Sequence, residues 1–192
     1  MRLGPIQLTP QTPHIAVPFS DAVTDAHIAH AYAHGARIAE LRVDLFADQS
    51  VSHCVRQAAR FSGFAKLLTL RHASETGRWV ASEARRVALY QQLLPAVDAV
   101  DLELLSEGAS EVASAAKQLG KVVVLSHHNS ELTPSVAALD ALYEQAKALG
   151  ADIFKVACMA HQADDVATLN AFLLKHRADN VVVIGMGGAG VS

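Results

Sequence analysis

KVVVLSHHNSELTPSVAALDALYEQAKALGADIFKVA, residues 121–157, holds two apolar runs on either side of an Ala- and Leu-rich segment. The runs at 121–126 and 152–157 are apolar along their length, which is typical of strands buried on both faces. The segment 135–149 has helical periodicity, begins just after Pro134 and is followed by Gly150, a frequent helix stop. This order predicts a strand–helix–strand unit with parallel strands.

The same alternation runs along the whole chain. Strands are expected at residues 14–19, 37–43, 66–71, 98–102, 121–126, 152–157 and 180–186. Helices are expected at residues 25–34, 51–62, 81–94, 109–119, 135–149 and 164–176. The strand starts recur at intervals close to the ~30 residues per unit of a (βα)8 barrel.

The length of the chain limits how much of such a barrel it can form. A complete barrel takes about 250 residues, whereas this chain has 192. We therefore expect an α/β fold, a parallel (βα) TIM-type barrel that lacks its eighth strand–helix unit. One domain over residues 1–192, incomplete at its C-terminal side, is expected. The first ten or so residues, which contain Pro5 and Pro10, are expected to be an irregular lead-in.

Composition excludes several classes of function. The formal net charge is -3 and no Lys/Arg run occurs, so nucleic acid is not an expected partner. No apolar stretch reaches the ~18 residues of a membrane helix, and the N-terminus does not have the order of a signal peptide. Cys54 and Cys158 form no metal or redox motif, so we expect reduced thiols in a cytoplasmic protein.

Charged residues fall near the C-terminal ends of the expected strands, where barrel enzymes carry their chemistry. In the second strand three charged positions alternate with aliphatic ones, which places them on one face. The polar residues concerned are Glu40, Arg42, Asp44, Arg71, Asp101, Glu103, Ser126, His127, His128 and Lys155. Charges inside buried strands are costly unless they are paired or functional.

Lys155 stands alone in the apolar run 152–157. A desolvated lysine near cations has a lowered pKa and can attack a ketone, so Arg42 and Arg71 are expected to activate it and to bind a carboxylate. The resulting iminium acidifies the adjacent C–H bond, and His128 is the expected base, oriented by Glu75. The residues alone thus predict a Schiff-base lyase or aldolase acting on an anionic keto compound.

These segments, taken together, resemble type I 3-dehydroquinate dehydratase. The motifs that carry the resemblance are Glu40-Leu-Arg42-Val-Asp44, Thr69-Leu-Arg71 followed by Glu75, Asp101-Leu-Glu103-Leu, Ser126-His-His128 with Thr133-Pro134, Asp152-Ile-Phe-Lys155-Val-Ala, and Met186-Gly187. The resemblance implies dehydration of 3-dehydroquinate to 3-dehydroshikimate in the shikimate pathway, without cofactor or metal.

The resemblance also implies a role for each matched residue. Lys155 forms the imine, His128 is the general acid and base, and Glu75 assists the histidine. Asp101 supports the histidine without touching the substrate itself. The positions that resemble substrate contacts are Glu40, Arg42, Arg71 and Met186.

The sequence departs from the family at its C-terminal side. The family follows its Met-Gly motif with an arginine that grips the substrate carboxylate, whereas this chain ends at Gly190-Val191-Ser192. A loop after strand eight, which supplies further contacts, is also missing. We expect either a shortened chain or one that covers its open edge by association, as a homodimer.

Three alternatives remain open at this stage. One is a class I aldolase-type barrel that binds a sugar phosphate at the Gly-rich end 187–190, and another is a truncated, non-catalytic homologue of the dehydratase. The third is a metal site formed by His27, His30 and His34, which share one helix face.

Overall fold

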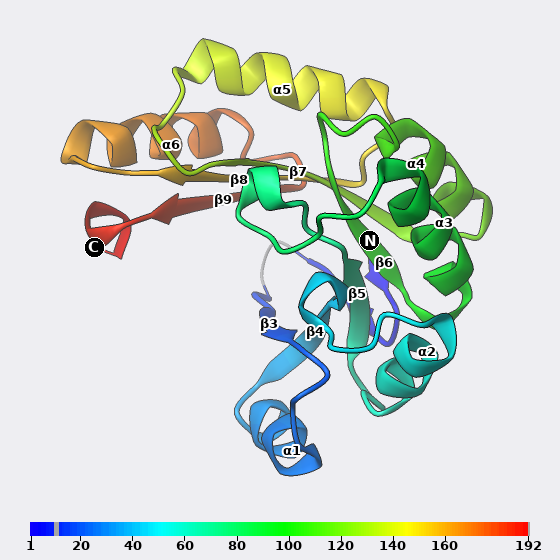
Figure 1. Cartoon of the computed structure of the whole chain (residues 1–192). Coiled ribbons are helices and arrows are strands. Elements are labelled where there is room, and N and C mark those ends of the chain that lie inside the picture. The colour runs from blue at the N-terminus through cyan, green and yellow to red at the C-terminus, as the bar shows by residue number, and fades with distance from the viewer. Residues whose placement is uncertain (10–11, 192) are drawn as a thin grey trace.

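The computed structural model describes residues 1–9 and 12–191 of the chain (Figure 1). A 7-stranded sheet has the order β3-β4-β5-β6-β7-β8-β9, and all its pairs are parallel. Its strands are β3 (Ile15–Phe19), β4 (Ala36–Arg42), β5 (Ala65–Thr69), β6 (Ala99–Glu103), β7 (Val122–Asn129), β8 (Ile153–Met159) and β9 (Val181–Met186). The predicted strand order and direction are confirmed.

A helix follows each of the first six strands of this sheet. The helices are α1 (Asp25–Ala33), α2 (Val51–Ala59), α3 (Glu83–Leu93), α4 (Ala109–Gln118), α5 (Val136–Ala148) and α6 (Ala163–Lys175). Short 3-10 turns lie at η1 (Val43–Leu45), η2 (Ala73–Glu75), η3 (Leu94–Ala96) and η4 (Gly188–Val191). The side chain of Ser135 caps α5 by accepting from the Ala138 amide, and Gly150 follows the helix with a φ of 83°, which explains the start and stop signals in the sequence.

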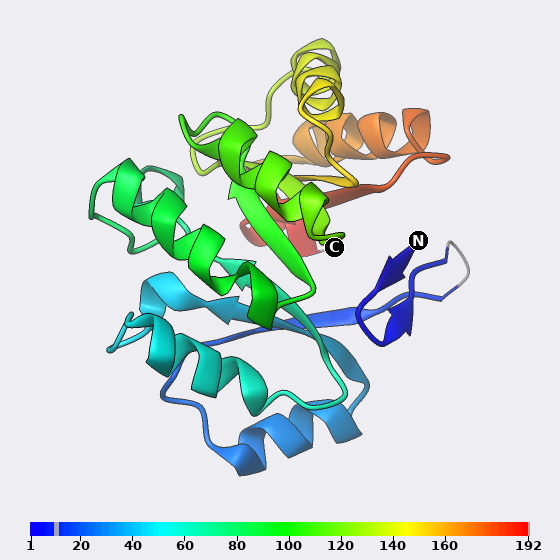
Figure 2. The same ribbon diagram turned by 90° about the vertical axis from the view of Figure 1, so that its right-hand side faces the viewer.

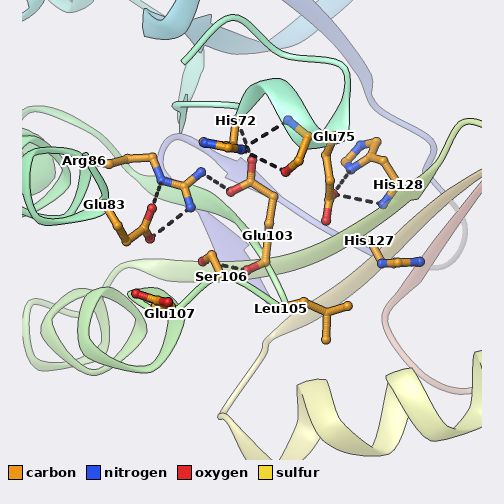
Figure 3. Close-up of a pocket in the computed structure, with 11 residues that line it drawn as sticks. His72, Glu75, Glu83, Arg86, Glu103, Leu105, Ser106, Glu107, His127 and His128 are labelled. Carbon is orange, nitrogen blue, oxygen red and sulfur yellow. Dashed lines mark hydrogen bonds and ion pairs between the residues drawn. The ribbon is translucent and has the colours of Figure 1, made fainter. Parts of the chain in front are cut away.

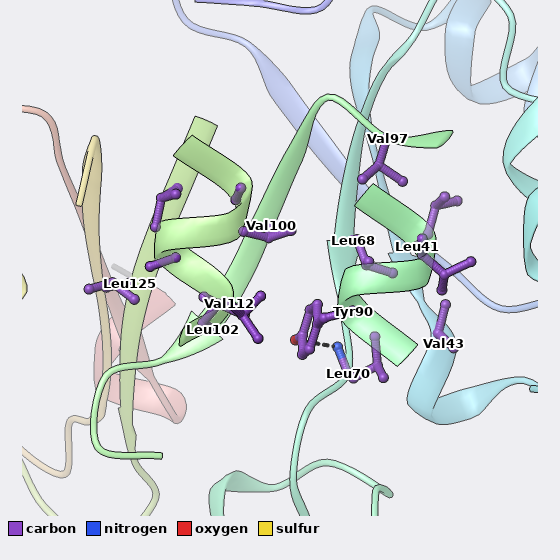
Figure 4. Packing of buried hydrophobic residues seen from close by; sticks show 14 of the residues in the cluster. Leu41, Val43, Leu68, Leu70, Tyr90, Val97, Val100, Leu102, Val112 and Leu125 are labelled. Carbon is purple, nitrogen blue, oxygen red and sulfur yellow. Dashed lines mark hydrogen bonds between the residues drawn. The ribbon is translucent and has the colours of Figure 1, made fainter. Parts of the chain in front are cut away.

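The main core lies between the sheet and the helices (Figure 4). Leu41, Leu68 and Val100, on neighbouring strands, are at most 2% exposed and pack in one cluster with Tyr90 of α3 and Val112 of α4. The alternating strand residues point to the other face of the sheet, where the polar side chains lie. The apolar core therefore holds the strands in the register that brings these polar groups together.

The sheet is curled into a half-barrel with its helices on the outside (Figure 1). Among the described residues, β3 and β9 each have a sheet neighbour on one side only, and an eighth strand–helix unit is absent, as predicted. Ile15 on β3 is 54% exposed, and Val182 and Ile184 on β9 are each 41% exposed. Apolar side chains are therefore accessible at both open edges.

The prediction of an irregular lead-in is wrong. β1 (Arg2–Leu3) and β2 (Ile6–Gln7) form an antiparallel hairpin beside the N-terminal end of the sheet (Figure 2). Leu3 is 4% exposed and packs in a second cluster with Ala65, Ala99 and Val122. These three residues are the first residues of β5, β6 and β7. The hairpin thus packs on the apolar N-terminal end of the half-barrel.

Two further expectations concern membrane helices and the cysteines. None of the helices in the described residues is long and apolar enough to cross a bilayer. Cys54 and Cys158 are both buried and unpaired, as expected for reduced thiols.

Candidate active site

Lys155 lies in the middle of β8 with its side chain on the inner face of the sheet, 17% exposed. Parallel pairing sets it opposite Ser126 on β7. Its Nζ donates to Asp101 Oδ2 on β6, at 2.9 Å. The lysine is therefore mostly buried, reachable from the open side of the half-barrel, and neutralised by a carboxylate.

Asp101 binds three partners at once. Its Oδ1 accepts from Arg71 Nη2 at 2.8 Å and from Ser126 Oγ at 2.6 Å, while Oδ2 faces Lys155. Burial raises the pKa of Asp101, but the positive charges of Arg71 and Lys155 and these hydrogen bonds outweigh it, so the pKa lies far below its ordinary value. Asp101 is therefore an anion at neutral pH that contacts the lysine directly.

The expected activation of Lys155 by nearby cations is wrong for the free protein. Burial lowers the pKa of Lys155, but the charges of Asp101 and Glu40 and the hydrogen bond to Asp101 raise it above its ordinary value despite Arg71. The Arg42 guanidinium turns to Asp44, with contacts of 2.9 and 2.7 Å. The resting lysine is therefore an ammonium ion.

His128 and Glu75 form the second part of the site (Figure 3). Glu75 Oε2 accepts from His128 Nδ1 at 2.9 Å and from the His128 backbone amide at 3.0 Å. A carboxylate at Nδ1 requires a proton there, which leaves Nε2 of the neutral ring as a proton acceptor. The predicted contact between these two residues is present.

The turn after β5 places Glu75 at this point. Arg71 leaves the strand, and its carbonyl accepts from the Trp79 amide at 3.0 Å, which closes the loop containing η2. A side chain at Gly77 would meet the Arg71 carbonyl oxygen at 2.0 Å, so only glycine fits there. The turn at Thr76-Gly77 thus lets the chain fold back after Glu75, whose side chain lies over the end of β7.

Arg71 is held by acceptors within the protein. Besides Asp101, it donates from Nη1 to Ser126 Oγ at 2.9 Å, and the same nitrogen lies 3.5 Å from Glu103 Oε1 and 3.8 Å from Glu75 Oε2. Arg71 is only 4% exposed. Most of its guanidinium therefore orients the acidic residues, and little of it is left to contact a substrate.

Sequence reasoning missed Arg86, a residue of α3 that is 3% exposed. Its Nη1 donates to Glu103 Oε2 and to the Leu70 carbonyl, and its other nitrogens bind Glu83. Glu103 in turn accepts from the His72 amide at 2.7 Å. This network attaches the loop that contains Glu75 to Glu103, at the end of β6.

Lys155 forms no hydrogen bond with three of the residues expected to contact the substrate, Glu40, Arg42 and Met186, in the described part of the chain. Glu40 accepts from Thr69 Oγ1 at 2.9 Å, and the Arg42 side chain is 21% exposed on the same face of β4. Met186 ends β9 and pairs in register with Met159, toward the C-terminal rim. These residues surround the inner face on the β4 and β9 sides.

A cavity of about 530 Å³ lies next to the histidine, lined by residues of the loop after β5, the loop after β6 and the end of β7 (Figure 3). Glu75, Glu103, His127 and His128 contribute to its wall, whereas Lys155 does not. Because the lysine faces the open side of the half-barrel, we place the candidate site there rather than in this cavity. His127 Nδ1 is buried without a partner among the described residues, and burial lowers the pKa of His127.

Metal ligation finds no support in the described part of the chain. No three His, Cys, Asp or Glu side chains are grouped there as a metal ion would require. On α1, His30 and His34 stack on each other at 4.0 Å, and His27 binds the helix cap Thr24.

Comparison with known proteins gives a consistent set of matches. A family model described as type I 3-dehydroquinase matches residues 15–192. The 3-dehydroquinate dehydratase of Thermodesulfovibrio yellowstonii is 32% identical over 158 residues, which cover 82% of this chain and 69% of that protein. The 3-dehydroquinate dehydratase of Aquifex aeolicus is 32% identical over 179 residues, covering 92% and 80%.

Solved structures agree with these sequence matches. The crystal structure of 3-dehydroquinate dehydratase from Aquifex aeolicus VF5 gives a TM-score of 0.84 at 32% identity, covering 93% of this chain and 80% of that chain. The corresponding structure from Geobacillus kaustophilus HTA426 gives 0.86 at 26% identity, covering 94% and 76%.

Proposed function

Because this chain belongs to the type I 3-dehydroquinase family, we propose that it dehydrates 3-dehydroquinate to 3-dehydroshikimate in the shikimate pathway, through an imine on Lys155. The observation that carries the proposal is the Lys155–Asp101 contact of 2.9 Å. A buried anion beside the lysine stabilises a cationic iminium there, and a histidine oriented by a carboxylate on the same rim can move the proton.

Asp101 favours the cationic intermediates of this reaction. The Lys155 ammonium first gives up a proton to His128 or to water, since the pKa of Asp101 is too low for it to keep one. The neutral amine adds to the ketone carbon, and the hydroxyl of the resulting carbinolamine takes that proton back and leaves as water, which gives an iminium. The iminium carries the same single positive charge as the resting ammonium, so Asp101 stabilises both without rearrangement.

His128 moves the proton in the elimination. Its Nε2 takes a proton from the carbon next to the iminium, and the resulting enamine expels the hydroxyl on the following carbon. The leaving oxygen takes that proton from His128 and departs as water. Hydrolysis of the iminium by one water then releases the conjugated enone and restores the Lys155 ammonium, so atoms and charge balance.

Substrate contacts are proposed for the residues around the lysine. Arg42, the more exposed of the two candidate arginines, meets the carboxylate, and Arg71 adds positive charge from behind while holding Asp101. Glu40 accepts from substrate hydroxyls, and Met186 lines the pocket on the β9 side. The chemistry requires only protein side chains, without a cofactor.

The alternative of a sugar-phosphate aldolase has no support in the comparisons, and residues 188–191 form the short turn η4. We further propose one domain over residues 1–192, a cytoplasmic location and a homodimer. The exposed apolar residues Ile15, Val182 and Ile184 at the open edges support association.

The test is the rate of 3-dehydroshikimate formation, followed by the ultraviolet absorbance of the enone. Lys155→Arg keeps the charge beside Asp101 but cannot form an imine, so the rate falls by about 10⁴-fold or more. Lys147→Arg, on the exposed side of α5, is the matched control and keeps the rate. A folded parent chain without any detectable rate would favour the non-catalytic homologue.

A further inference from the structure

Ser126 lies on the middle one of three neighbouring strands that carry the site. It lies on β7, is 0% exposed, and pairs in register with Lys155 on β8 and Glu103 on β6. From the sequence, Ser126 is one of several polar residues near the strand ends and has no assigned role. Its hydroxyl nevertheless contacts two of the charged groups that surround the lysine.

The hydroxyl of Ser126 has a defined direction. It accepts from Arg71 Nη1 at 2.9 Å, so its single proton is free to be donated elsewhere. The Asp101 Oδ1 atom lies 2.6 Å away, and the Leu102 carbonyl lies at the longer distance of 3.3 Å. The shorter, charge-assisted contact to the carboxylate takes the proton.

These contacts divide the two oxygens of Asp101 between different partners. Oδ1 receives hydrogen bonds from Ser126 and from Arg71, whereas the resolved partner of Oδ2 is Lys155 alone. Two donors on one oxygen fix the rotation of the carboxylate and withdraw charge from it. The remaining oxygen is held toward the Lys155 amine.

We propose that Ser126 is a positioning residue that sets the orientation and charge of the Asp101 carboxylate, and through it the reactivity of the Lys155 amine. Its catalytic consequence rests on the proposed function, whereas its effect on the amine does not. Ser126 itself reaches neither the substrate nor the reacting atoms in this scheme.

The direction of the effect follows from the charges that face Lys155. Asp101 on β6 and Glu40 on β4 hold the proton on the amine, and Arg71 at the end of β5 opposes them. The Ser126 hydrogen bond lowers the pKa of Asp101, which means that it stabilises the carboxylate charge. Without it, that charge acts more strongly on Lys155, and the neutral amine becomes rarer at a given pH.

The first experiment needs no substrate. Reductive methylation by formaldehyde and cyanoborohydride is followed at Lys155 by peptide mass spectrometry between pH 7 and 10. In Ser126→Ala the rate at Lys155 falls by about fivefold to tenfold at pH 8, and its rise moves to higher pH. Ser126→Thr, which keeps the hydroxyl, restores the parent profile. Ser106→Ala is the matched control, because its partly buried hydroxyl binds the Glu103 carbonyl only.

Activity gives the second test. In Ser126→Ala, kcat for 3-dehydroquinate falls about tenfold with KM nearly unchanged, and the rising limb of the pH profile moves upward. If the alanine variant does not fold, Ser126→Cys, nearly the same size but a weak donor, replaces it. A Lys155 labelling profile equal to that of the parent in a folded variant overturns the proposal. A parent chain without activity but with the predicted labelling shift would reject the proposed function alone.

Discussion

The hydroxyl of Tyr90 bridges two strands directly behind the charged site, and replacing Tyr90 by Phe tests how much that bridge contributes. Pairing between β5 and β6 extends only from Leu67 to Thr69 on the β5 side. Beyond it, the Leu70 amide donates to Tyr90 Oη at 2.8 Å, and the hydroxyl donates to the Asp101 carbonyl at 2.7 Å. The Tyr90 side chain, on α3, thus connects the two strands beyond their pairing, and Figure 4 shows its contact with Leu70.

The magnitude follows from what Phe leaves behind. Tyr90 is 2% exposed, so neither backbone group gains water when the hydroxyl is removed. Two hydrogen bonds worth roughly 1 kcal/mol each are lost, and two buried polar groups stay unsatisfied. We expect the free energy of unfolding to fall by about 2–4 kcal/mol, which corresponds to a Tm lower by roughly 4–16 °C for a chain of this size.

The assay is urea unfolding followed by circular dichroism, with Tyr32→Phe as the matched control. Tyr32 is 40% exposed, so its hydroxyl reaches water and its loss changes stability by less than about 0.5 kcal/mol. A Tyr90→Phe loss below about 1 kcal/mol would refute the reasoning, since the bridge would then be dispensable.

Three further predictions concern the site and the thiols. In Glu75→Gln, kcat falls by about 10²-fold with little change in stability, because the amide still accepts from His128 but lacks the charge that supports the imidazolium; steady-state kinetics checks this. Asp101→Asn lowers the free energy of unfolding at pH 7 by about 3–5 kcal/mol. Since the folded pKa of Asp101 is lowered, its contribution is complete above the unfolded pKa of ~3.9 and is lost as pH falls below it, so urea melts of parent and variant converge in acid. Burial raises the pKa of Cys54 and of Cys158 to about 11, so both thiols react slowly with a disulfide reagent at pH 8 until urea unfolds the chain; fast reaction of either would contradict the buried positions.

The sequence predicted the half-barrel because parallel strands buried on both faces are apolar along their length, as in 152–157. The N-terminal hairpin escaped this reasoning, since strands of two residues carry no periodicity. The contact between Glu75 and His128 was predictable because both residues lie at the C-terminal rim, although β6 separates β5 from β7 in the sheet.

The electrostatics of the site were less predictable. The sequence shows that Arg42 and Lys155 lie on inner faces, but only the fold shows that Arg42 turns to Asp44. The raised pKa of Lys155 follows from Asp101 at 2.9 Å, a distance that residue order does not contain. Arg86 was missed because a helical arginine is usually solvated, and its burial against Glu103 depends on the packing of α3.

The central claim is that the Lys155 amine forms a covalent imine with the substrate beside Asp101. Incubation with 3-dehydroquinate and borohydride, followed by peptide mass spectrometry, tests it most directly. The account predicts a reduced adduct on Lys155 that is lost in Lys155→Arg. An adduct on another lysine, or turnover of the substrate without any adduct, would contradict it.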